Sequence, residues 1–176
     1  MKPCAVYTFG VDGLTGTVLT ETERVLREKF NLRLEYGGDL RPPLMGARDG
    51  QLLADALLYH LVKVKPPQAV AALGLTPHDL YSNGLNFVFG LASPLHGAAV
   101  VSYARLVDPD GDLFRSRVRK EVTHEMGHVF GLEHCPTPGC VMNFSNSLYE
   151  VDLKGEDFCP SCRKKLEKRL KELGIV

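Results

Sequence analysis

The chain has 176 residues, 44% of them hydrophobic, which suits one domain with a single core. Lysine and arginine total 21, as do aspartate and glutamate, so the zero net charge favours neither nucleic acid nor an anionic membrane as a partner. No run approaches the ~18 uninterrupted apolar residues of a membrane span, and the first residues lack a signal-peptide pattern. We therefore expect a cytoplasmic protein without a membrane or nucleic-acid partner.

The first hundred residues predict strands that alternate with helices. Short apolar or alternating runs between Gly, Pro, Asn and Ser turns predict strands at 4–10, 32–37, 69–75, 85–92 and 97–106. Helices are expected at 20–30, where Thr20 and Glu23 are spaced as a capping box, and at 49–64. This order predicts an α/β (α+β) fold, in which helices pack on a twisted mixed sheet.

A third helix is predicted from about Leu113 to Phe130, after the turn DPDGD. At 100° per residue, one stripe is apolar and suits the core: Val118, Val122, Met126 and Val129. The far side carries polar residues: Arg117, Glu121, His124 and His128. We expect this second face to look into a cleft.

His124 and His128 are one helical turn apart, so their imidazoles can converge on one metal ion. Glu125 is offset by about a quarter turn, toward the position of a metal-bound water. Gly131 can adopt positive φ, end the helix and turn the chain back sharply. His134 can then complete the metal site from below, as a zinc peptidase requires.

The segment HEMGHVFGLEH resembles the HExxHxxGxxH motif of metzincin zinc peptidases, and Met142 stands where these proteins have the Met-turn methionine. The four cysteines that follow resemble the archaemetzincin pattern in particular: Cys135, Cys140, Cys159 and Cys162. The resemblance implies a metzincin-like zincin fold with an active-site helix and a small zinc-stapled C-terminal lobe. It also implies a peptide or protein substrate and two zinc ions per chain, one catalytic and one structural. Phe144 replaces the tyrosine of astacins, so we expect no tyrosine ligand.

The four clustered cysteines could form two disulfides, which a thermophile's cytosol would permit, or could bind one zinc ion. A Cx4C and a CxxC can supply four thiolates at about 2.3 Å, and CxxC spans a zinc with less strain than a disulfide. We favour zinc. Two sites would then abut at the His134–Cys135 peptide, and the structural zinc would hold the loop that positions His134. Cys4 is left over and is expected to be a buried free thiol.

No repeat, linker or low-complexity tract divides the chain. We therefore expect one metallopeptidase domain over 1–176. An N-terminal α/β subdomain, 1–131, would contain the active-site helix. A C-terminal subdomain, 132–176, would contain the Met-turn and the four-cysteine site.

The predicted function is zinc-dependent peptide hydrolysis with Glu125 as general base. We expect an edge strand at 97–106 to form the upper wall of the cleft and to pair with an extended substrate.

Two alternatives stay open: a narrow hydrolase of small amides or amino-terminal residues, and a non-catalytic zinc module that binds protein or nucleic acid. The second would use the basic helix 163–176, whose exposed charges are more typical of a solvated face, and it leaves Glu125 without a purpose. Three other histidines are interpreted as structural: His60, His78 and His96.

Overall fold

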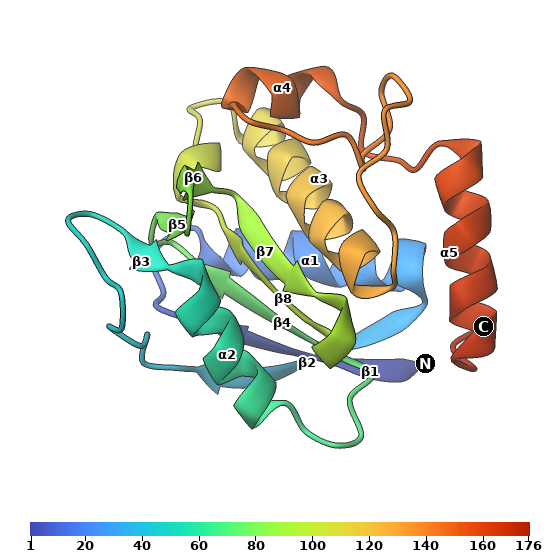
Figure 1. The fold of residues 1–176 in the computed structure, drawn as a ribbon, viewed down its shortest axis with the longest axis horizontal. Coiled ribbons are helices and arrows are strands. Elements are labelled where there is room, and N and C mark those ends of the chain that lie inside the picture. The colour runs from blue at the N-terminus through green and yellow to red at the C-terminus, as the bar shows by residue number, and fades with distance from the viewer.

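The computed structural model describes all 176 residues. The fold is built on a five-stranded sheet with the strand order β2-β1-β4-β8-β7 (Figure 1). Four strands are parallel: β1 (Lys2–Thr8), β2 (Leu32–Asp39), β4 (Ala71–Thr76) and β8 (Ala98–Ser102). The edge strand β7 (Gly90–Ser93) is antiparallel to β8. The predicted mixed sheet is therefore confirmed. β4 and β8 are buried along their whole length because helices cover both faces of the sheet.

Three helices make the two outer layers (Figure 1). α1 (Thr15–Phe30) and α3 (Gly111–Val129) pack on one face, where they share a core with Val6 of β1. α2 (Ala54–Val64) packs on the other face, against residues such as Tyr7. Successive side chains of β1 thus enter opposite cores, as the two-residue period of a strand requires. The apolar stripe predicted for the third helix lies in the first of these cores.

A second sheet contains β3 (Leu52–Leu53), β5 (Leu80–Ser82) and β6 (Leu85–Val88). The single strand expected at 85–92 is wrong, because β6 pairs with β5 while β7 pairs with β8. The chain passes from one sheet to the other at the buried Phe89. Residues of both strands nevertheless line one cavity.

The start of α1 also differs from the prediction. The helix begins at Thr15, so Thr20 lies inside it and its hydroxyl donates to the carbonyl of Gly16 at 3.0 Å. No capping box forms there. Asp12 instead organises the turn before the helix, since its carboxylate accepts from the amide of Leu14 at 2.9 Å.

The C-terminal segment adds α4 (Leu148–Leu153) and α5 (Pro160–Glu172), and α5 runs beside the N-terminal end of β1 (Figure 1). Leu166 and Leu170 of α5 join the core shared by α1 and α3. Asn31 fastens the end of the chain by donating to the carbonyl of Ile175 at 2.8 Å. Two short 3-10 helices, Pro94–His96 and Ala104–Leu106, flank β8. None of the helices has the length and apolar character needed to cross a membrane.

Candidate active site

Three histidines converge at the C-terminal end of α3. The Nε2 atoms of His124 and His128 lie 3.1 Å apart, and the ring of His134 lies with its centroid 5.3 Å and 4.8 Å from theirs. The convergence depends on Gly131, whose φ of 95° confirms the predicted turn. The amide of Gly131 donates to the carbonyl of His128, and the amide of Leu132 donates to that of Gly127, each at 2.9 Å. These two bonds form a Schellman motif, which ends the helix and returns the chain toward it.

The first two imidazoles are oriented by backbone carbonyls. The Nδ1 atom of His124 lies 2.8 Å from the carbonyl oxygen of Val141, and that of His128 lies 2.7 Å from that of Leu132. Because a carbonyl can only accept, Nδ1 carries the proton and Nε2 presents a lone pair to the shared space. Burial keeps the pKa of all three histidines below the ordinary value, so they are uncharged near neutral pH. Three neutral imidazoles are a suitable donor set for zinc.

Glu125 is buried and faces the same cavity as the histidines. Burial, and then the negative charge of Glu121 one turn earlier, raise the pKa of its carboxyl to about 8, while Lys154 opposes the shift. A dication bound by the histidines would favour the ionised form. The side chain lies against β7, where a Cβ added at Gly90 would be 2.7 Å from Cγ of Glu125. Glu125 therefore occupies space that only a glycine leaves open.

The cavity in front of the histidines has a volume of about 340 Å³. One wall is formed by β6, Phe89 and β7, and the opposite wall by the segment 144–146. Most of the side chains on the first wall are apolar: Leu85, Phe87, Val88, Phe89, Leu91 and Ala92. The strand at the cleft is thus β7, and the predicted edge strand at 97–106 is wrong, because β8 lies between β4 and β7.

Met142 is completely buried beneath the histidine site. A Cβ at Gly127 would be 2.6 Å from its sulfur, so the methionine packs directly on α3 between the two helical histidines. Its carbonyl accepts from the amide of Cys135 at 3.0 Å, which joins the Met142 turn to the segment that carries His134. This is the placement expected of a Met-turn.

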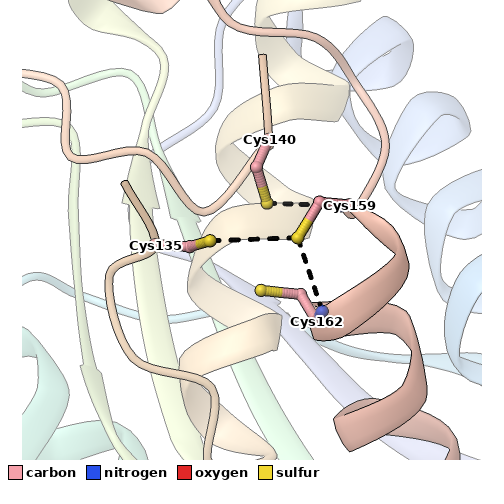
Figure 2. Close-up of side chains that lie close together, drawn as sticks. All are labelled: Cys135, Cys140, Cys159 and Cys162. Carbon is pink, nitrogen blue, oxygen red and sulfur yellow. Dashed lines mark hydrogen bonds between the residues drawn. The ribbon is translucent and has the colours of Figure 1, made fainter. Parts of the chain in front are cut away.

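The four clustered cysteines come together beside the first turn of α5 (Figure 2). All are free thiols, their sulfurs lie within 4.8 Å of one another, and those of Cys135 and Cys159 are 3.8 Å apart. A disulfide requires about 2.05 Å, whereas a tetrahedron with 2.3 Å bonds has edges of about 3.8 Å. The amide of Cys162 donates to the sulfur of Cys159 and lowers the pKa of that thiol to about 6. The cluster therefore fits zinc and not the alternative of two disulfides.

The other histidines and Cys4 lie outside both metal-ligand groups. His60 packs edge-on against Phe9, and Nδ1 of His96 lies 2.9 Å from the hydroxyl of Ser93. Cys4 is a buried free thiol as predicted, and burial raises its pKa to about 12.

One expectation about the polar face of α3 needs correction. Arg117 does not look into the cleft; its guanidinium is buried and pairs with Asp152 at 2.8 Å. Glu121 lines the cavity as predicted, and it is paired there with a buried lysine, Lys154. Neither Lys154 nor the wall residues belong to a motif, so the sequence offered no signal for them.

Comparison with known proteins supports the same chemistry. Residues 44–168 match the sequence model of Peptidase family M54. An archaemetzincin of Methanopyrus kandleri is 54% identical over 125 residues, which are 71% of each chain. A crystal structure of archaemetzincin from that organism has a TM-score of 0.89 and 41% identity, covering 97% of this chain and 96% of that one. A crystal structure of archaemetzincin from Archaeoglobus fulgidus in complex with malonate has a TM-score of 0.80 and 36% identity, covering 93% of this chain and 99% of that one.

Proposed function

The chain belongs to Peptidase family M54 and is a zinc metallopeptidase that acts on peptides or proteins, and we propose that its catalytic centre is the histidine site at the end of α3. In this proposal His124, His128 and His134 hold the catalytic zinc and Glu125 is the general base. The observation that carries it is the convergence of the three imidazoles in one cavity with a buried carboxylate.

The chemistry divides between the ion and the protein. A zinc ion held by His124, His128 and His134 would lower the pKa of a water molecule and would polarise the scissile carbonyl as a Lewis acid. Glu125 accepts the proton of the attacking water and then returns it to the departing amine. The Nδ1 hydrogen bonds of His124 and His128 hold their rings, so that neither ligand must reorganise during the reaction.

The position of β7 supports an extended substrate. β7 is paired on one side only, so its free edge can add a substrate segment as a further strand. The side chains beside it are largely apolar, which favours an apolar residue of the substrate in the cavity. A small amide has too few backbone groups to pair along an edge strand of four residues. These features therefore support a peptidase over the narrow hydrolase of small amides.

The cysteine site has a supporting role in this proposal. Cys135, Cys140, Cys159 and Cys162 hold the structural zinc, while Gly131 and Met142 shape the segment that delivers His134. The chain is one metallopeptidase domain in which 132–176 forms the C-terminal subdomain. Its free thiols suit the reducing cytoplasm, and its zero net charge suits a protein without a nucleic-acid partner.

A proteomic peptide-library digest tests the proposal. The zinc-loaded protein is compared with Glu125→Gln, which keeps the shape of the side chain and should keep both zinc ions, yet should lose about 10²–10⁴ in rate. Glu133→Gln is the matched control, because Glu133 is exposed and does not line the cavity. Cleavages that disappear only in Glu125→Gln support the proposal. Equal cleavage by the zinc-loaded Glu125→Gln protein would remove Glu125 from the mechanism.

A further inference from the structure

A buried lysine lies directly behind the histidine site and has no part in the chemistry proposed above. The side chains of Lys154 and Glu121 are only 1% and 3% exposed, and Nζ of Lys154 is 3.1 Å from a carboxylate oxygen of Glu121. The same Nζ lies 3.4 Å from the carbonyl oxygen of Asn143 and 3.5 Å from Nδ1 of His124. One ammonium group therefore meets α3, the chain after Met142 and a candidate zinc ligand.

Stability alone gives little reason for this pair. Removing two charges from water carries a desolvation cost that their mutual attraction often fails to exceed, and apolar side chains of similar volume frequently stabilise as well or better. An ion pair with this little exposure therefore indicates that the two elements carrying it must be held in a fixed position. The surroundings of the pair show which elements these are.

The pair joins the two elements that define the site. Glu121 belongs to α3, one turn before Glu125. Asn143 directly follows the turn whose Val141 carbonyl accepts from His124. The cavity wall, 144–146, is the continuation of the same segment. A link from Lys154 to both Glu121 and Asn143 thus holds this segment against the helix at the level of His124.

We propose that Lys154 is a positioning residue, which through Glu121 and Asn143 fixes the carbonyl that orients His124 and the cavity wall that meets the substrate. Loss of the link should let the segment 141–146 move away from α3. The Nδ1 hydrogen bond of His124 would then weaken, and the zinc affinity of the histidine site would fall. The wall would move with it, so KM for a peptide would rise.

Lys120 offers a matched control. It is also buried and also fastens the C-terminal segment to α3, since its ammonium donates to the carbonyls of Val151 and Asp152 at 3.0 Å and 3.4 Å. It contacts neither Asn143 nor a histidine in these bonds. Lys120→Met should therefore destabilise the fold without changing the histidine site.

The test uses the double variant Glu121→Gln/Lys154→Met, which removes the link without leaving one unpaired buried charge. Zinc affinity of the histidine site is measured by chelator competition on the full chain, together with kcat and KM and the urea midpoint. We expect an affinity about 10–100-fold below wild type, as is typical when the partner of a metal-binding histidine is disturbed, and an increased KM. Lys120→Met should stay within about twofold of wild type in affinity and KM.

Two results would overturn the inference: wild-type zinc affinity and KM in the double variant, or an equal loss of affinity in Lys120→Met. The inference rests on the proposed role of His124 as a zinc ligand. If the wild-type chain binds zinc and cleaves peptides, and the double variant has the same zinc affinity and KM, the link is refuted but the proposed function is not. A wild-type chain with no zinc at the histidines would refute the proposed function and the link together. Should the double variant unfold, Lys154→Met alone also removes both contacts of the ammonium group, and wild-type affinity and KM in that variant would equally refute the link.

Discussion

Gly90→Ala should slow catalysis far more than it destabilises the fold. The added Cβ would lie 2.6 Å from the carbonyl oxygen of Val100 and 2.7 Å from Cγ of Glu125. Carbon atoms pack favourably at about 3.5–4.0 Å, so either β7 or Glu125 must move by about 1 Å. Displacing a catalytic group by that distance can cost about 10²-fold in rate, equivalent to about 2.7 kcal/mol of transition-state stabilisation.

Gly74→Ala is the control for overpacking. A Cβ at Gly74 would be 2.8 Å from Cε2 of Phe9 and 3.2 Å from Cγ1 of Val100, both in the core beneath α2 and away from Glu125. Overpacking of this kind costs about 1–3 kcal/mol of unfolding free energy. Gly74→Ala should therefore lower the urea midpoint while keeping kcat/KM within about threefold of wild type.

The assay is kcat/KM on a peptide taken from the library digest, with zinc content and urea unfolding measured on the same samples. Gly90→Ala should keep both zinc ions, because the three atoms nearest to the added carbon belong to Val100 and Glu125 and not to a candidate zinc ligand. Full zinc content with kcat/KM within threefold of wild type would refute the contact between β7 and the general base in the working enzyme.

Three further outcomes are expected. Protein purified without chelator should contain about two zinc per chain by elemental analysis, and a chelator should remove the open histidine-site zinc first; a single zinc would contradict this. Replacing Cys159 and Cys162 with serine should lower zinc affinity at the histidine site about 10–100-fold, because the segment that carries His134 loses its support; an unchanged zinc titration would make the two sites independent. The third concerns acid stability. Arg119 lowers the pKa of Glu156 to about 2, so the pair stabilises the fold fully above about pH 4.5 and loses that contribution as pH falls toward 2. With 32% of the Glu156 side chain exposed, we expect Glu156→Gln to cost about 1–2 kcal/mol at pH 7 in urea unfolding. The cost should shrink below pH 4, and a cost independent of pH would contradict the assignment.

The candidate metal ligands were predictable because their arrangement is local. His124 and His128 share a helix face whatever the rest of the chain does, since 3.6 residues per turn sets their spacing. Gly131 is the residue type that the following turn requires, and the turn brings His134 back within six residues. The four cysteines were predictable as a set, because a Cx4C and a CxxC separated by a short segment can supply four thiolates to one tetrahedral ion.

The sheet was predictable only as a collection of strands. The sequence indicates apolar runs at 85–92 and 97–106, but strand order depends on pairing between distant segments, which no local pattern encodes. For that reason the sequence predicts the edge strand wrongly at 97–106, while the fold places β8 inside the sheet and β7 at its edge. The division of 85–92 between two sheets has the same origin.

The surroundings of the site were decided by the tertiary structure alone. A lysine in sequence is expected to be solvated, and only the packing of the segment after Met142 on α3 buries Lys154 against Glu121. Gly90 likewise reads as an ordinary glycine until Glu125 is found to occupy the space that its side chain would fill. The sequence by itself determined which residues can bind zinc, because covalent spacing and helix geometry act over a few residues. Contacts between residues far apart in the chain decide which strand and which buried charges surround the zinc-binding residues. Such contacts exist only once the chain has folded.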